Sequence, residues 1–201
     1  MITAAPAEVA IFAASTETFS RKNINQSIDE SFATYTQVCD RARAADMRVR
    51  GYLSTAFGCP YEGAVSEETV ATLSARLIDL GVFEVAVSDT IGIAQPGDVP
   101  RVLEAVLAQV PAGQIALHFH DTRGQALANV KAALPFGIAT FDGSAGGLGG
   151  CPYAPGAPGN LATGDLIQML DGLGIETGVS LDALTRASSF VRSKLTRPSA
   201  T

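Results

Sequence analysis

The chain has 201 residues, of which 47% are hydrophobic and 17% are charged, so it can bury one sizeable core and is too apolar to be disordered. The 14 Lys and Arg residues stand against 20 Asp and Glu residues, and the net charge of −6 argues against sequence-independent binding to nucleic acid or to an anionic membrane. An anionic ligand would therefore need a local cluster of cations.

The cysteines and the N-terminal residues predict where the protein works. Cys39, Cys59 and Cys151 are odd in number and far apart, which suits a reducing compartment better than a disulfide framework. No run of about 18 apolar residues is present to span a membrane. No Lys or Arg precedes Arg21, unlike a signal or transit peptide. We expect a single cytoplasmic domain over residues 1–201.

Five short apolar runs are predicted strands, and each is followed by a helix signal. The runs are Glu8–Ala13, Val49–Ser54, Phe83–Ser88, Ile115–His120 and Ile138–Gly143. Strands that are apolar on both faces and alternate with helices are typical of a parallel sheet. The sequence therefore predicts an α/β fold.

Capping residues mark the predicted helices. Ser27 and Glu30 have capping-box spacing ahead of a helix that reaches about Ala45. A second helix opens at Ser66 and ends at Gly81, where a left-handed cap costs little. Four further helices are expected at Asp98–Pro111, Gln125–Leu134, Asp165–Leu170 and from Ser180 to near Arg197.

The architecture is either an open doubly wound sheet or a TIM-type (β/α)₈ barrel. A dinucleotide-binding sheet would show G-x-G-x-x-G directly after its first strand, whereas Ala13 is followed by ASTETFS. Polar residues instead end nearly all of the strands, which is the barrel pattern. These residues are Ser15, Glu17, Ser54, Asp89, Thr90, His118, His120, Asp121 and Asp142. With five βα units, the chain is predicted to supply about the last five of the eight units of a barrel.

The segment LHFHD carries the strongest chemical signal. His118 and His120 are two apart in a predicted strand, so both imidazoles project to one face, and they are the only histidines in the chain. Two imidazoles at the catalytic rim of a barrel suit a divalent cation. The alternative is a pair of half-buried, hydrogen-bonded histidines. For Asp121 we favour a helix cap over a contact with a metal-bound histidine.

The other candidate residues each have a structural alternative. Asp89, in SDTIG, is either a loop cap or an active-site carboxylate. Cys151 lies in AGGLGGCPYAPGAPGN, where three prolines favour a shaped lid that brings a reactive thiol to a substrate. Cys39 is expected in the core, and Cys59 is left open. Asn160 either caps the next helix or offers its amide oxygen to a metal.

Four segments together resemble 3-hydroxy-3-methylglutaryl-CoA lyase, a family of the metal-dependent TIM-barrel lyases and synthases. They are RGYLSTAFGCPYEG, SDTIG, HFHDTRGQALAN and AGGLGGCPYAPGAPGNLAT, and the resemblance covers about Glu8 to Arg197. It implies that His118, His120 and Asn160 bind Mg²⁺ or Mn²⁺, that Cys151 is the catalytic lid thiol, and that Asp89 lies in the active site.

The resemblance also implies the reaction and the partners. The acyl-CoA substrate, 3-hydroxy-3-methylglutaryl-CoA, would be cleaved to acetyl-CoA and acetoacetate, a step of leucine degradation and ketone-body formation. His118 would relay the proton of the C3 hydroxyl, Asp89 would orient or assist it, and Cys151 would protonate the enolate. A homo-oligomer is expected.

The sequence departs from the family pattern at two places. The family carries an Arg-Asp-Gly motif on its first barrel strand, and no Arg-Asp pair occurs here; Gly164 stands where Glu is usual. A truncated chain with negligible activity is therefore expected, unless Glu17 or Asp142 supplies a further ligand. The alternatives are a Claisen-condensing synthase, a hydroxy-oxoacid aldolase, and a non-catalytic remnant that associates with a partner.

Overall fold

The computed structural model describes residues 8–150 and 159–195, and a parallel sheet of five strands lies at its centre. The strands are β1 (Glu8–Ala14), β2 (Arg48–Ser54), β3 (Glu84–Asp89), β4 (Ile115–Phe119) and β5 (Thr140–Asp142). Each strand pairs with the next along the chain, in the order β1-β2-β3-β4-β5. A doubly wound sheet would reverse its order at a switch point, so this order favours the barrel.

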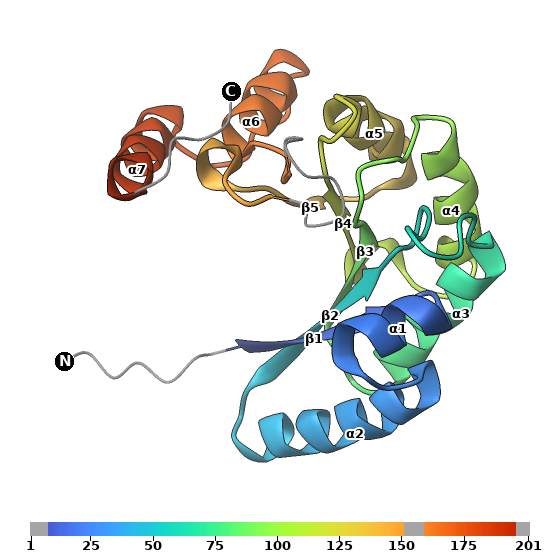
Figure 1. Cartoon of the computed structure of the whole chain (residues 1–201). Helices are drawn as coiled ribbons and strands as arrows, with labels where there is room; N and C mark the ends of the chain where they lie inside the picture. The colour runs from blue at the N-terminus through green and yellow to red at the C-terminus, as the bar shows by residue number, and fades with distance from the viewer. Residues whose placement is uncertain (1–7, 151–158, 196–201) are drawn as a thin grey trace.

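Helices cover one side of the curved sheet (Figure 1). They are α1 (Glu17–Ile24), α2 (Ile28–Ala44), α3 (Glu67–Asp79), α4 (Asp98–Leu107), α5 (Ala126–Ala133), α6 (Thr163–Gly172) and α7 (Leu181–Lys194), with short 3₁₀ turns η1 (Ala112–Gln114), η2 (Leu134–Phe136) and η3 (Ala145–Gly147). Helices α1 to α5 follow the sheet on this side, and α6 and α7 lie beyond β5. No helix of the described ranges covers the opposite, concave face.

The predicted caps form as expected. The Ser27 side chain accepts a hydrogen bond from the Glu30 amide at 3.1 Å, and the Glu30 carboxylate accepts one from the Ser27 amide at 2.7 Å. Gly81 follows α3 with φ of 92°, a left-handed conformation that glycine adopts without strain. The Ser180 side chain accepts from the Ala183 amide and opens α7. Side-chain caps thus mark the starts of α2, α3 and α7, whereas α1, α4, α5 and α6 begin without one.

Some predicted boundaries differ from the structure, and one helix was missed. Helix α4 ends at Leu107, before Pro111. Strand β5 is only three residues long, because Ile138 and Ala139 precede its pairing with β4. The missed helix is α1, which has eight residues and buries little beyond Phe19 and Ser20. A helix this short and polar has almost no apolar periodicity to recognise.

The core lies between the sheet and the helices that cover it. Along each strand, alternate side chains point toward this layer and are almost fully buried. They include Ile11, Ala13, Val49, Leu53, Val85, Val87, Ile115, Leu117 and Phe119. The remaining strand residues face the concave side, and they carry most of the polar groups. In the described part of the chain, we find no helix long and apolar enough to cross a membrane.

Candidate active site

A hollow of about 660 Å³ lies on the concave face, toward the carboxyl ends of β4 and β5. Its lining residues are Phe12, Tyr52, His118, Phe141, Asp142, Gly143, Ser144, Asn160 and Thr163. The strand register explains why they meet, since His118 on β4 lies opposite Ser88 on β3 and Asp142 on β5. The hollow is therefore at the rim where the sequence predicted the chemistry.

The two histidines lie side by side at this rim. The ring centroids of His118 and His120 are 5.1 Å apart. His120 follows the last residue of β4 and forms an isolated bridge with Asn160. Burial and the neighbouring His118 lower the pKa of His120 to about 4, although a hydrogen bond with Asn160 acts in the opposite direction. The imidazole of His120 is therefore neutral at physiological pH, which is the form that can bind a metal.

Asn160 is held in one orientation by the glycine-rich segment before it. Its side-chain amide nitrogen donates to the backbone oxygen of Leu148 at 3.0 Å. The amide oxygen is then left to face His120, in agreement with the hydrogen bond between those two side chains. Of the two roles considered for Asn160, this orientation fits an oxygen ligand.

Two glycines, Gly149 and Gly159, let the backbone pass close to the side chain of Asn160. A Cβ on Gly149 would lie 2.4 Å from the side-chain nitrogen of Asn160, and one on Gly159 would lie 1.9 Å from the Gly149 oxygen. Gly149 also has φ of 107°, which side chains rarely allow. The backbone around residues 149 and 159 therefore packs too tightly for any other residue.

A half-buried network of charges lies beside the histidines. Asp142 Oδ2 is 3.4 Å from His118 Nδ1, and Asp142 Oδ1 is 2.9 Å from Arg50 Nη1. Arg50 Nε also donates to Glu84 at 2.7 Å, and its Nη1 contacts the Tyr52 hydroxyl. Burial raises the pKa of Asp142, but the hydrogen bond from His118 and the charge of Arg50 outweigh it and hold that pKa below its usual value.

Arg50 and Tyr52 were absent from the sequence-based candidates. A signal existed, because Arg48, Arg50, Tyr52 and Ser54 alternate along β2 with buried residues. A row of polar side chains at period two indicates a strand whose second face is not simply core. The pairing of Arg50 with Asp142, 92 positions away, had no signal in the sequence.

Asp89 lies on the other face of the sheet. Its pairing partner is Phe119, a core residue, and its side chain is 1% exposed. Its two carboxylate oxygens accept hydrogen bonds from the amides of Ile93 and Ala94, both at 3.0 Å. These contacts correspond to the loop-cap alternative. The active-site role of Asp89 stays a prediction that no contact within the described ranges supports.

The remaining candidates are placed as follows. Asp121 accepts a hydrogen bond from the amide of Ala126, the first residue of α5, as a capping carboxylate would, although Gln125 occupies the N-cap position. Cys39 is 3% exposed, and burial raises the pKa of its thiol, as expected for a core residue. Cys59 is also buried, and its sulfur accepts from the Thr16 hydroxyl at 3.1 Å. Cys151 lies outside the described residues.

The residues present fit a divalent cation. His120 Nδ1 is buried and has no hydrogen-bond partner among the described residues, and such an atom is costly unless something binds it. Two imidazoles and an amide oxygen offer nitrogen and oxygen donors to a cation such as Mn²⁺. Within residues 8–150 and 159–195, no group of three His, Cys, Asp or Glu side chains is placed to hold a metal, so this donor set includes the amide of Asn160.

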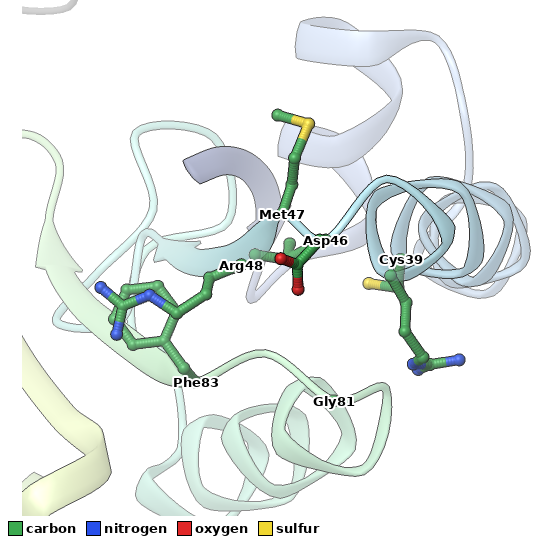
Figure 2. Close-up of a pocket in the computed structure, with 8 residues that line it drawn as sticks. Cys39, Asp46, Met47, Arg48, Gly81 and Phe83 are labelled. Atoms are coloured by element: carbon green, nitrogen blue, oxygen red, sulfur yellow. The ribbon is translucent and has the colours of Figure 1, made fainter. Parts of the chain in front are cut away.

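A second pocket, of about 230 Å³, lies at the amino ends of β2 and β3 (Figure 2). The Arg48 guanidinium stacks over the Phe83 ring, 4.2 Å from its centroid. Cys39 and Gly81 line the same pocket from the helix side. In barrels this end serves stability and the opposite end serves chemistry, so we assign no catalytic role to this pocket.

Comparison with known proteins identifies the family of the chain. The HMGL-like family model matches residues 2–191. Hydroxymethylglutaryl-CoA lyase YngG of Bacillus subtilis is 52% identical over 191 residues, which are 95% of this chain and 64% of that protein. The mitochondrial hydroxymethylglutaryl-CoA lyase of Rattus norvegicus is 52% identical over 196 residues, 98% of this chain and 60% of that protein. The chain thus spans less than two thirds of these relatives.

Solved structures give the same result. The hydroxymethylglutaryl-CoA lyase from Pseudomonas aeruginosa matches with a TM-score of 0.93 and 47% identity, over 97% of this chain and 65% of that one. An HMG-CoA lyase from Acinetobacter baumannii, solved with coenzyme A and 3-methylmalate, matches with a TM-score of 0.88 and 37% identity, over 97% of this chain and 64% of that one. The five parallel strands are part of a TIM-type barrel, and the chain belongs to the HMGL-like family.

Proposed function

We propose that the chain supplies the carboxyl-terminal five βα units of a divalent-metal-dependent lyase that cleaves 3-hydroxy-3-methylglutaryl-CoA to acetyl-CoA and acetoacetate. The observation that carries this proposal is the convergence of His118, His120 and the oriented amide of Asn160 at one rim. The likeness to lyases that are about half identical supports the choice of substrate. A relative that holds coenzyme A supports an acyl-CoA ligand.

His118, His120 and Asn160 would hold Mg²⁺ or Mn²⁺. When bound, the cation supplies positive charge that lowers the pKa of a hydroxyl and stabilises an oxygen anion. Because two of the three ligands are imidazoles, we choose Mn²⁺ as the probe for binding experiments.

His118 has one ring nitrogen left for this chemistry, because Nδ1 faces Asp142. We assign Nε2 the ligand role. The proton-accepting role expected for His118 would use the same nitrogen, so the two roles compete, and the second stays a prediction. Neutral His120 presents no positive charge that would repel a cation.

In the proposed cleavage, the C3 hydroxyl of the substrate gives its proton to a base, for which His118 is the predicted residue, and its oxygen forms the new carbonyl of acetoacetate. The C2–C3 bond breaks, and its electron pair passes to C2 as the enolate of acetyl-CoA. Cys151 would donate a proton to C2, and its thiolate would then be reprotonated from solvent. The aromatic pair Phe12 and Tyr52, stacked at 4.7 Å, forms an apolar wall near the hollow that would help to exclude water.

The alternatives within the superfamily, a Claisen-condensing synthase and a hydroxy-oxoacid aldolase, are less well supported, because the relatives described above are lyases. We also propose a cytoplasmic location, since the three cysteines suit a reducing compartment. A homo-oligomer is proposed on the resemblance alone.

The test is acetoacetate formation from 3-hydroxy-3-methylglutaryl-CoA in the presence of Mn²⁺, by the chain alone and co-expressed with the preceding barrel segment of the Bacillus relative. We expect negligible turnover alone and a gain of about 10³-fold or more with the segment, by analogy with the loss of electrostatic groups elsewhere. His120→Ala in the combined protein should abolish the gain. Asp29→Ala, which removes an exposed ion pair with Arg76, is the matched control.

Two results would contradict the proposal. Substantial turnover by the unaided chain would mean that it finds its remaining ligands internally. No turnover in the combined protein, despite tight Mn²⁺ binding, would favour the non-catalytic alternative.

The role of Cys151 is tested by partial alkylation and mass mapping. A general acid must be reached by substrate, so Cys151 should react faster with a thiol reagent than Cys39 or Cys59, which are both buried. Preferential labelling of Cys39 would contradict the catalytic assignment of Cys151 and the core assignment of Cys39.

A further inference from the structure

We propose that Asp142, anchored by Arg50, is a positioning residue that holds His118 in the tautomer with the proton on Nδ1 and so keeps Nε2 free for the cation. This inference rests on the metal site of the proposed function. It assigns the orienting role to Asp142 in place of Asp89, whose carboxylate faces the other side of the sheet.

The geometry places the carboxylate behind the imidazole. Asp142 is the register partner of His118, and its Oδ2 lies 3.4 Å from Nδ1. The His118 and Asp142 side chains are 24% and 20% exposed, so water competes little for this contact. A carboxylate accepts hydrogen bonds and cannot donate them, so a neutral His118 must carry its proton on Nδ1 to bond with Asp142.

Asp142 is itself fixed by Arg50. The Nη1 atom of Arg50 lies 2.9 Å from Oδ1 and 3.1 Å from Oδ2 of Asp142, and Nε donates to Glu84. Arg50 thus bridges carboxylates on β3 and β5 with a guanidinium that is 14% exposed. A carboxylate pinned in this way cannot rotate to serve as a metal ligand without breaking both contacts.

Small side chains on β3 and β4 let the Arg50 side chain reach from β2 to Asp142 on β5. On the concave face, the row between Arg50 and Asp142 contains Ala86 on β3 and its register partner Ala116 on β4. Both alanines are fully buried. Because they rise little above the sheet, the guanidinium can pass over them from β2 toward β5. The network is therefore built into the concave face of the sheet.

A carboxylate behind a metal-binding histidine sets its tautomer and its orientation, and removing such a partner typically costs about 10-fold to 100-fold in metal affinity. Asp142→Asn tests the role of the carboxylate because it removes the charge and keeps the shape of the side chain. The Arg50 guanidinium only donates, so it would take the amide oxygen of the new side chain. The amide NH₂ would then face His118 Nδ1, and the imidazole proton would move to Nε2.

The tautomer is read directly by two-bond ¹H–¹⁵N NMR of the imidazoles at about pH 8, where a free imidazole is neutral. The chain has only two histidines, so His120→Ala assigns both sets of signals. We expect the Nδ1–H form of His118 in the wild-type chain and the Nε2–H form in Asp142→Asn. Asp29→Asn, at an exposed carboxylate paired with Arg76, should leave the spectrum unchanged.

Mn²⁺ titration by calorimetry is the second measurement. Asp142→Asn should bind about 10-fold to 100-fold more weakly than the wild type, and Asp29→Asn should bind equally well. If Mn²⁺ fails to bind the wild type while the tautomer switches as expected, the positioning role stands and the metal site of the proposed function fails.

Two results would overturn the inference. One is the Nε2–H form of His118 in the wild-type chain, which needs no variant and so does not depend on the folding of Asp142→Asn. The other is equal Mn²⁺ affinity in wild type and Asp142→Asn when the tautomer has switched.

Discussion

On the face of the sheet that the helices cover, the strands contribute residues such as Val87 and Leu117, which are fully buried. On the concave face, the same strands contribute Arg50, His118 and Asp142, which remain partly exposed and bond to one another. Neighbouring residues of one strand therefore belong to different environments. One face of the sheet thus carries most of the free energy of folding, and the other is available for chemistry.

The largest expected effect is a difference in stability between substitutions at two adjacent residues of β4, Leu117 and His118. Leu117→Ala should lower the free energy of unfolding by about 2–5 kcal/mol, because it opens a cavity in the core. His118→Ala should cost far less stability but should abolish Mn²⁺ binding. Urea denaturation and calorimetry on both variants give the measurement. Equal losses of stability would show that the two faces are not divided in this way.

A second prediction concerns the glycines that hold Asn160. Gly159→Ala places a Cβ 1.9 Å from a backbone oxygen, so the backbone must shift. We expect the free energy of unfolding to fall by about 1–3 kcal/mol and Mn²⁺ to bind more weakly. Gly164→Ala is the control, since nothing lies within 4 Å of its Cβ position and it lies inside α6. That change should stabilise by about 0.5–1 kcal/mol. Thermal melts and Mn²⁺ titrations would compare the two. Similar melting temperatures and Mn²⁺ affinities for the two variants would refute the tight packing of the backbone at Gly159.

A third prediction concerns a substitution that weakens only the layer of helices. Ser27→Ala removes the side-chain half of the capping box on α2 and should cost about 1 kcal/mol. Because α2 packs on the covered side of the sheet, the tautomer of His118 and the affinity for Mn²⁺ should not change. A change in the tautomer or in the Mn²⁺ affinity would show that the helical layer is coupled to the concave face.

The smallest effects should appear in the dependence of stability on pH. The pKa of Asp142 is lowered, so its stabilising contribution is present above the ordinary Asp pKa and is lost as pH falls through the lowered value. Burial raises the pKa of Asp89 despite the opposing backbone hydrogen bonds, so its contribution is fully present at low pH and is lost as pH rises through the raised value.

The two carboxylates should therefore respond in opposite directions. As pH falls from 7 to 3, the difference in unfolding free energy between wild type and Asp142→Asn should shrink, and that between wild type and Asp89→Asn should grow. Urea midpoints across this range provide the test. Parallel curves for the two variants would contradict the assigned environments.

Much of the fold followed from local sequence rules. The five strands, the capping box at Ser27 and the left-handed end of α3 at Gly81 were predicted, because they depend on neighbours within a few residues. The spacing of His118 and His120 likewise placed both rings on one face. The short polar helix α1 was missed, since its apolar pattern is too brief to detect.

The tertiary structure alone decided which carboxylate serves His118. Asp89 and Asp142 both end strands, and the family resemblance had pointed to Asp89 for this role. Pairing in the sheet turned Asp89 toward the helices and set Asp142 behind the imidazole. Strand alternation can be read along the chain. The choice of partner depends on register and on the reach of Arg50 across two alanines, which exist only once distant strands lie side by side.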